Sequence, residues 1–211
     1  MAAAPRRCWL LKSEPSAFSF ADLLAAPGRR TAWTGIRNHQ ARNLLRDELQ
    51  VGDGVLFYHS SSDPSGVAGL ARVSRSARPD PTQFDPRSAQ YDPRSRRTAP
   101  TWVEVEIEAA EALPRFVTLA ELKAHPALAR MLVVQRGSRL SVQPVRDEEW
   151  RTVLEIARSP APEPAPYATS KSMIGKGLRR MRPEAGPRQA RRHNGAPRNP
   201  PGQPKPSGRS R

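Results

Sequence analysis

Two strand-like runs of the sequence each end in polar residues and a proline. They are residues 9–15 (WLLKSEP) and residues 137–144 (GSRLSVQP). Proline has no N–H to donate to a sheet ladder, so each run must end or leave its sheet at that point. Polar side chains at the ends of rigid strands are suited to line a ligand site. The two runs therefore mark a candidate binding site.

Common catalytic motifs are absent from the sequence. It contains no Gly-x-Ser-x-Gly elbow, phosphate-binding loop or His-Glu-x-x-His run, and no ligand set at zinc spacing. The single cysteine, Cys8, excludes an intrachain disulfide. We therefore expect no catalytic residue, metal or cofactor. The alternative is a hydrolase with Ser13 or Cys8 as nucleophile and His59 as base, which must lie within hydrogen-bond reach.

The charge of the chain is strongly positive and unevenly distributed. Its 35 Lys and Arg residues exceed its 20 Asp and Glu residues by a net charge of +15. Residues 159–211 hold 12 of the basic residues and only 2 acidic ones. Such a field favours polyanionic partners such as nucleic acid. No apolar stretch approaches the roughly 18 residues that cross a bilayer. We expect no membrane partner and a cytoplasmic location, nucleoid-associated in a bacterium or nuclear in a eukaryote.

The composition divides the chain into three parts. Residues 1–7 form a short N-terminal extension, and residues 8–157 have the mixed pattern of one compact domain. Residues 158–211 form a basic tail rich in proline and arginine. That tail cannot bury enough apolar surface to offset its ordering entropy, so we expect it to be disordered.

Hydrophobic periodicity predicts short strands and helices within residues 8–157. Strands are predicted at residues 8–12, 55–58, 67–73, 102–108 and 139–145. Helices are predicted at residues 40–49 and after three caps, which are Ser19 with Asp22, Thr118 with Glu121, and Asp147. In the strand at 102–108, apolar residues alternate with Glu104, Glu106 and Glu108, so one face should meet a core and the other water. The pattern favours an α/β mixed (α+β) fold, a small and largely antiparallel β-barrel with peripheral helices.

A long segment at residues 78–100 interrupts this pattern. Three Asp-Pro pairs break it, and only Phe84 and Tyr91 offer apolar anchors. Loops of this length inside a domain are usually functional or disordered. The alternative is a surface excursion that the two aromatic side chains hold in place.

An ordered set of segments resembles the EVE domain family. These segments are residues 9–15, 33–38 (WTGIRN), 57–60 (FYHS) and 137–145, together with 51–53 (VGD), the Asp-Pro segment and 118–123. The resemblance covers residues 8–157. It implies a PUA-like fold related to the YTH readers of methylated RNA, and a pocket that accepts an extruded modified base, commonly a cytosine derivative in DNA. Relatives fused to nucleases make a nuclease a conceivable partner.

This resemblance assigns a role to twelve residues. The predicted base pocket consists of Trp9, Ser13, Glu14, Trp33, Asn38, Tyr58, Ser60, Ser141 and Gln143. The predicted phosphate contacts are Lys12, Arg37 and Arg139. Stacking on an aromatic ring is worth about 1–3 kcal/mol, comparable with the cost of extruding a base, so edge recognition must supply the selectivity. The implied function is a non-catalytic reader of modified cytosine in DNA, or in RNA.

Each assignment has a structural alternative. A tryptophan in a domain of this size can be a core residue, and Asn38 can cap the following helix. Lys12 and Glu14 can form a surface ion pair worth about 0–1 kcal/mol, and Gln143 can satisfy the backbone near Pro144. At the level of the chain, the basic tail could bind any nucleic acid, in which case affinity would ignore base identity and fall steeply with salt.

Overall fold

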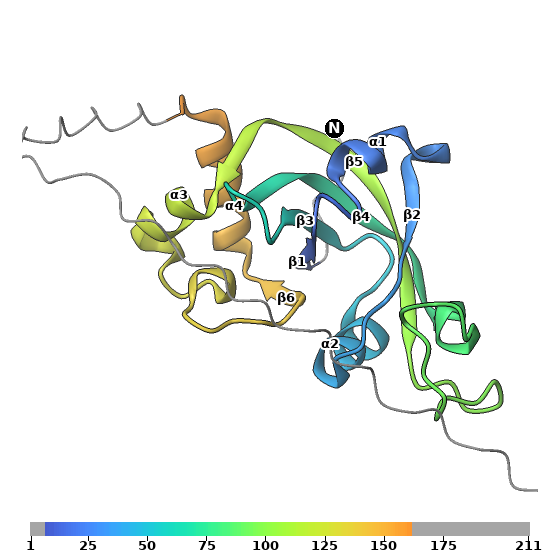
Figure 1. The fold of residues 1–211 in the computed structure, drawn as a ribbon. Coiled ribbons are helices and arrows are strands. Elements are labelled where there is room, and N and C mark those ends of the chain that lie inside the picture. The colour runs from blue at the N-terminus through green and yellow to red at the C-terminus, as the bar shows by residue number, and fades with distance from the viewer. Residues whose placement is uncertain (1–6, 162–211) are drawn as a thin grey trace, which may run out of the picture. The chain divides into compact units, whose positions relative to one another are not determined.

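The computed structural model describes residues 7–161, which form one six-stranded sheet with helices on both faces (Figure 1). Residues 1–6 of the predicted extension and nearly all of the predicted tail lie outside these residues. The strands are β1 (Cys8–Ser13), β2 (Arg30–Trp33), β3 (Gly54–His59), β4 (Gly66–Pro79), β5 (Val103–Thr118) and β6 (Val142–Val145). Their order across the sheet is β2-β5-β4-β3-β1-β6. Every neighbouring pair is antiparallel except β1 and β3.

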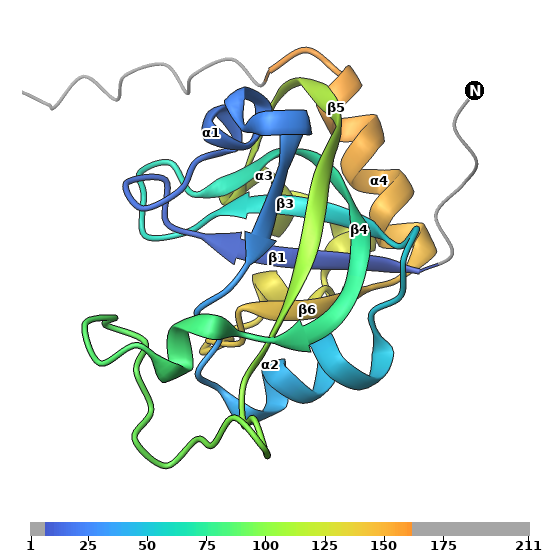
Figure 2. The same ribbon diagram turned by 90° about the vertical axis from the view of Figure 1, so that its right-hand side faces the viewer.

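The mixed, largely antiparallel architecture confirms the prediction in part, but the sheet is not closed. Strands β2 and β6 are its two edges, and each contains only four residues. The long strands β4 and β5 bend along their length (Figure 2), and their pairing register shifts at four places. Such bulges bend and twist a strand. The sheet is therefore strongly curved without becoming a closed barrel.

The helices begin largely where the capping patterns predicted. They are α1 (Phe20–Ala25), α2 (His39–Asn43) with a π-helical extension (Leu44–Glu48), α3 (Leu119–Ala124) and α4 (Asp147–Arg158). Both predicted capping boxes are present, at Ser19 and at Thr118. For α4 the prediction was wrong by one residue, because Arg146 is the N-cap and its N–H donates to the Glu149 carboxylate at 2.9 Å.

Strand alternation divides the core into two clusters, one on each face of the sheet. Trp9 and Phe57 belong to the cluster beneath α1 and α2, whereas Leu10 and Tyr58 belong to the cluster beneath α3 and α4. Successive side chains of a strand point to opposite faces, so neighbours in β1 and β3 enter different clusters. The position of a residue in its strand therefore decides on which face of the sheet its side chain packs.

Strand β5 shows the predicted alternation, with one difference. Val105 and Ile107 are fully buried, but Glu104 is also only 3% exposed. Its carboxylate accepts from Arg78 Nε at 2.7 Å, and Glu108 pairs with Arg30 and Arg72. This side of β5 is consequently an ion-pair ladder across the sheet rather than a row of carboxylates in water.

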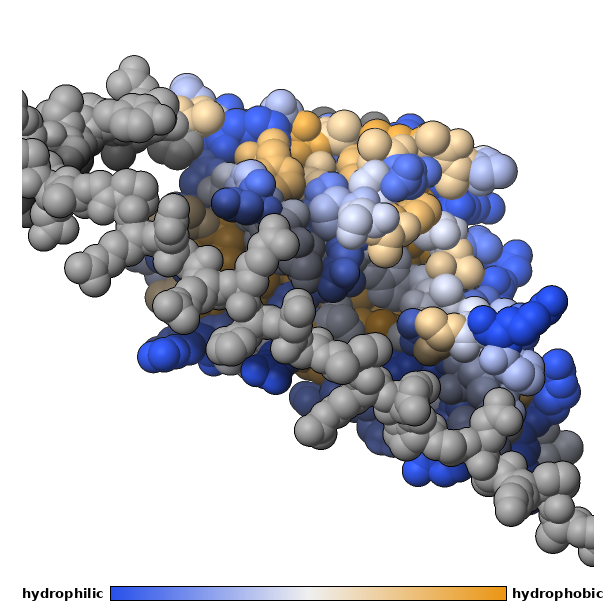
Figure 3. Space-filling view, in the orientation of Figure 1, coloured by the Kyte–Doolittle hydropathy of each residue, from blue (hydrophilic) through white to orange (hydrophobic). Residues whose placement is uncertain are grey.

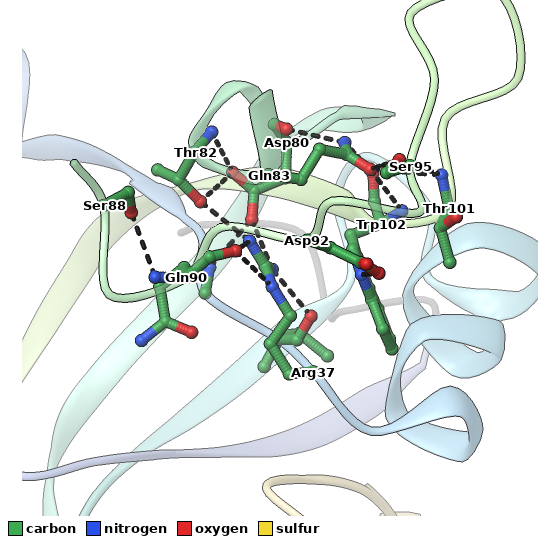
Figure 4. A network of polar contacts seen from close by, with 12 residues as sticks. Arg37, Asp80, Thr82, Gln83, Ser88, Gln90, Asp92, Ser95, Thr101 and Trp102 are labelled. Carbon is green, nitrogen blue, oxygen red and sulfur yellow. Dashed lines mark hydrogen bonds and ion pairs between the residues drawn. The ribbon is translucent and has the colours of Figure 1, made fainter. Parts of the chain in front are cut away.

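The segment after β4 is anchored mainly by polar groups, and of the two predicted aromatic anchors only Phe84 is half-buried, with the Arg97 guanidinium 4.8 Å from its ring centroid. Tyr91 is 42% exposed, whereas Gln83 is fully buried. The Gln83 amide donates to Asp80 O and Trp102 O and accepts from the N–H groups of Thr101 and Trp102 (Figure 4). One glutamine thus joins both ends of the segment.

The surface over this segment is mainly hydrophilic, while hydrophobic residues gather along the edge beside α1 (Figure 3).

Candidate nucleobase-binding site

A pocket of about 470 Å³ lies where β1 and β2 end. Its walls come from residues 12–18, from residues 31–38 and from Ser141, which precedes β6. The volume falls within the roughly 300–1,000 Å³ typical of small-molecule sites. Seven predicted site residues line it, namely Lys12, Ser13, Glu14, Trp33, Arg37, Asn38 and Ser141. The two proline-terminated runs therefore do meet at one hollow, and the roles of these residues in binding stay predictions.

Two aromatic side chains form apolar walls of the pocket. Trp33 is 7% exposed and packs edge-on against Phe57, with ring centroids 5.4 Å apart. Phe18 is half-buried and lies 6.4 Å from the same ring. Phe18 was missed in the sequence, where its only signal is an aromatic residue just after the first proline-terminated run. Trp33 serves the core and the pocket at the same time.

The polar side chains of the pocket have part of their hydrogen-bonding capacity already committed. The Ser13 hydroxyl donates to Phe18 O at 2.6 Å, so its lone pairs remain as acceptors. Asn38 Oδ1 accepts from Ala41 N–H at 3.0 Å as the N-cap of α2, which leaves the amide NH₂ as a donor. Glu14 is exposed and accepts from Ser61 Oγ at 3.0 Å. Of these three residues, Ser13 and Glu14 are left as acceptors and Asn38 is left as a donor.

Three predicted pocket residues are structural, and a fourth does not line the pocket. Trp9 is 1% exposed and its indole N–H donates to Asp53 Oδ2 at 2.9 Å, so it cannot stack on a ligand. Tyr58 is 3% exposed in the cluster on the opposite face of the sheet. Gln143 is 1% exposed and donates to Leu140 O at 2.7 Å. Ser60 lies outside the lining and donates to Ser13 O at 3.3 Å.

Two of the three predicted phosphate contacts are committed within the protein. Lys12 Nζ donates to Ser138 O at 3.1 Å, and burial lowers the pKa of this amine. The Arg37 guanidinium bonds to Asp80 at 2.8 Å and to Gln90 O. Arg139 is exposed and has no ion-pair or hydrogen-bond partner within residues 7–161. Of these three residues, Arg139 alone has no partner among the described residues and can meet a phosphate.

A buried carboxylate fixes the wall of the pocket that contains Arg37. Asp80 is fully buried and also accepts from Gly35 N–H at 3.1 Å (Figure 4). Burial by itself raises the pKa of Asp80, but hydrogen bonds from Thr82, Arg37, Thr34 and Gly35 outweigh that effect and lower it to about 2. Gly35 has a φ of +80°, which glycine adopts without steric cost. The carboxylate is thus charged at neutral pH and holds the turn between β2 and α2.

Among residues 7–161, no hydrogen bond joins Ser13 or Cys8, the nucleophiles considered, to His59, the base considered. Burial, with smaller contributions from Asp147 and Asp53, raises the pKa of Cys8 to about 12. His59 Nε2 accepts from Phe20 N–H at 3.0 Å, and burial lowers the pKa of this imidazole. The Ser13 hydroxyl proton points to a backbone carbonyl instead.

Within residues 7–161, no helix is long and apolar enough to cross a bilayer. No group of three or more His, Cys, Asp or Glu residues in this part of the chain could hold a metal ion.

Comparison with known proteins decides the family. The EVE domain model matches residues 7–156. The chain belongs to the EVE domain family. Thymocyte nuclear protein 1 of Homo sapiens is 41% identical to it over 164 residues, which cover 70% of this chain and 72% of the relative.

Solved structures of similar proteins share the fold of this EVE domain. A protein from Pseudomonas syringae is 39% identical, with a TM-score of 0.68 over 71% of this chain and 99% of its own. Human THYN1 in complex with DNA that contains 5-methylcytosine is 37% identical, with a TM-score of 0.70 over 74% of this chain and 99% of its own. Residues 7–156, which the family model matches, contain every residue that lines the candidate pocket.

Proposed function

We propose that this EVE domain is a non-catalytic reader that takes one extruded, modified cytosine of DNA into the pocket between β1 and β2. The pocket itself carries the proposal, because it combines apolar walls with a small set of convergent polar groups. The similar human protein in complex with 5-methylcytosine-containing DNA supports this choice of ligand. We also propose that the curved, open sheet corresponds to the PUA-like fold that the family resemblance implies.

The polarity of the pocket edge favours cytosine over thymine. Cytosine presents an exocyclic amino donor, whereas thymine presents a carbonyl acceptor at the same place. Ser13 Oγ and the Glu14 carboxylate are left as acceptors for that amine, and the Asn38 NH₂ is left as a donor for a ring acceptor. An unpaired buried polar group costs about 1–3 kcal/mol, which corresponds to roughly fivefold to 150-fold in affinity. The flat faces of the base would lie against the walls that Trp33 and Phe18 provide.

A titration with matched oligonucleotides tests the proposal. Duplexes that differ only in carrying cytosine, 5-methylcytosine, 5-hydroxymethylcytosine or thymine at one position are titrated at fixed salt, with an RNA series alongside. We expect a modified cytosine in DNA to bind most tightly. Equal affinity for all four DNA duplexes would refute base reading, and a preference confined to RNA would refute the choice of DNA.

Asn38→Asp separates recognition from folding. Aspartate caps a helix as well as asparagine, so the bond to Ala41 N–H is retained while the NH₂ donor is lost. We expect this variant to keep its stability and to lose its preference for the modified base. Asn43→Asp is the matched control, because Asn43 is exposed on the same helix and does not line the pocket. If both variants keep the preference, the Asn38 amide is not a recognition group.

Binding driven by the basic tail is the competing function, because residues 159–211 hold most of the excess positive charge. Tail-driven binding would ignore base identity and weaken steeply with salt. We expect residues 1–161, which contain the entire region matched by the family, to keep the preference for modified cytosine with lower overall affinity. Loss of the preference together with the tail would favour the competing function.

A further inference from the structure

A second hollow adjoins the proposed base pocket. It also measures about 470 Å³, and its walls are Gln40 and parts of the segment 132–140. Asn38 lines both hollows, so one side chain forms part of the boundary between them. The two hollows therefore meet at Asn38.

Buried groups hold the segment that walls the second hollow. Lys12 Nζ donates to Ser138 O at 3.1 Å, and the buried Gln143 amide donates to Ser138 Oγ at 3.0 Å and to Leu140 O at 2.7 Å. Gly137 has a φ of +78°, which lets the chain turn there at little cost. The wall is thus positioned by the same β1 residue that lines the base pocket, and Gln143 has a structural purpose.

The side chains presented to this hollow suit a nucleotide. Arg136 and Arg139 are exposed and have no ion-pair or hydrogen-bond partner among the described residues, and no acidic residue lines the hollow. Leu132 is 40% exposed, unusual for a large hydrophobic side chain in the described part of this chain. Guanidinium groups match phosphate geometry, and an apolar side chain offers contact for a sugar or a base face.

We propose that the second hollow binds the nucleotide adjacent to the extruded base in the same strand. Its phosphate contacts Arg136 and Arg139, and its sugar or base lies against Leu132. The inference rests on the proposed function, because an extruded nucleotide stays joined to its neighbours by phosphodiester bonds and Asn38 lies between the two hollows. The domain then senses the nucleotide on one side of the modified cytosine as well as the cytosine itself.

The phosphate contacts are tested by the salt dependence of binding. Full-length protein and its double variant R136A/R139A are titrated with duplex DNA containing one 5-methylcytosine at several salt concentrations. Loss of two phosphate contacts reduces the slope of log K against log salt by about 1.4–1.8. The control R151A/R158A removes two exposed arginines from α4 and should leave the slope unchanged. Equal slopes for the two double variants, both confirmed as folded by urea unfolding, would overturn the phosphate assignment.

The neighbouring nucleotide is tested with an abasic residue placed on either side of the 5-methylcytosine. We expect an affinity loss of roughly threefold to tenfold on one side only, and L132A should abolish that difference between sides, because it removes the apolar side chain that contacts the neighbouring nucleotide. Equal affinities for the two abasic duplexes would overturn the inference even if the preference for modified over plain cytosine is intact. If the wild-type protein shows no preference for modified over plain cytosine, the proposed function is refuted, and the inference about the neighbouring nucleotide is refuted with it.

Discussion

Replacement of Asp80 by asparagine tests whether one buried carboxylate holds the pocket wall. The carboxylate accepts hydrogen bonds from Gly35, Arg37 and Thr82 at 2.6–3.1 Å. Its pKa falls from 3.8 to about 2. At about 1.4 kcal/mol per pKa unit, the charged form is favoured in the native state by roughly 2–3 kcal/mol. Asparagine keeps the shape but has no charge and only one acceptor oxygen, so D80N should be less stable by about this amount at neutral pH.

The dependence on pH provides the sharper test. Because the native pKa of Asp80 is depressed, its contribution is fully present above about pH 4 and is lost as the pH falls through about 2. Urea unfolding followed by tryptophan fluorescence at several pH values should therefore show a gap between wild type and D80N that narrows towards pH 2. Asp85→Asn, at a partly exposed carboxylate of the same segment, should change stability by less than about 0.5 kcal/mol. A D80N protein as stable as wild type at pH 7, or a gap independent of pH, would refute this reasoning.

Three further predictions concern single residues. Cys8, whose pKa is raised to about 12, should resist iodoacetamide at pH 8 in the native protein and react in urea; native labelling at the rate of a free thiol would contradict its burial. Lys12→Gln should weaken discrimination of methylated from plain DNA, because Lys12 lines the pocket and its Nζ holds Ser138. The slope of log K against log salt should not change, since Nζ is bonded within the protein; a slope lower by about 1 would indicate a phosphate contact instead. Gly69→Ala should lower the free energy of unfolding by about 1–3 kcal/mol, and the urea midpoint with it, because the new methyl group overlaps the Phe20 ring. An unchanged midpoint would show that the Phe20 ring moves aside without cost.

Local sequence signals predicted the elements that frame the pocket. The capping boxes at Ser19 and Thr118 are four-residue patterns whose partners are neighbours in the chain, and both are present. The apolar run of β1 followed by polar residues predicted a hollow at the end of this strand, and Lys12, Ser13 and Glu14 line one, whereas their roles in binding stay predictions. These features depend on short-range geometry, which a sequence carries directly.

Tertiary partners explain the errors. Trp9 lies inside the β1 ladder opposite Val55, so its side chain enters the core and bonds to Asp53 rather than lining the pocket. Arg37 was predicted to contact a phosphate, but its guanidinium donates to the carboxylate of Asp80, a residue 43 positions away. Which arginine is free and which is paired depends on contacts between distant segments, and spacing along the chain does not encode it.

The central claim, that the pocket between β1 and β2 receives the modified base, is tested most directly by NMR. Amide resonances of isotope-labelled protein are followed as 5-methylcytosine and plain duplexes of the same sequence are added at equal saturation. The largest differences between the two titrations should fall on residues 13–18, residues 33–38 and Ser141, with little difference along α4. Identical shifts in both titrations, or differences that avoid these residues, would contradict the proposed base pocket.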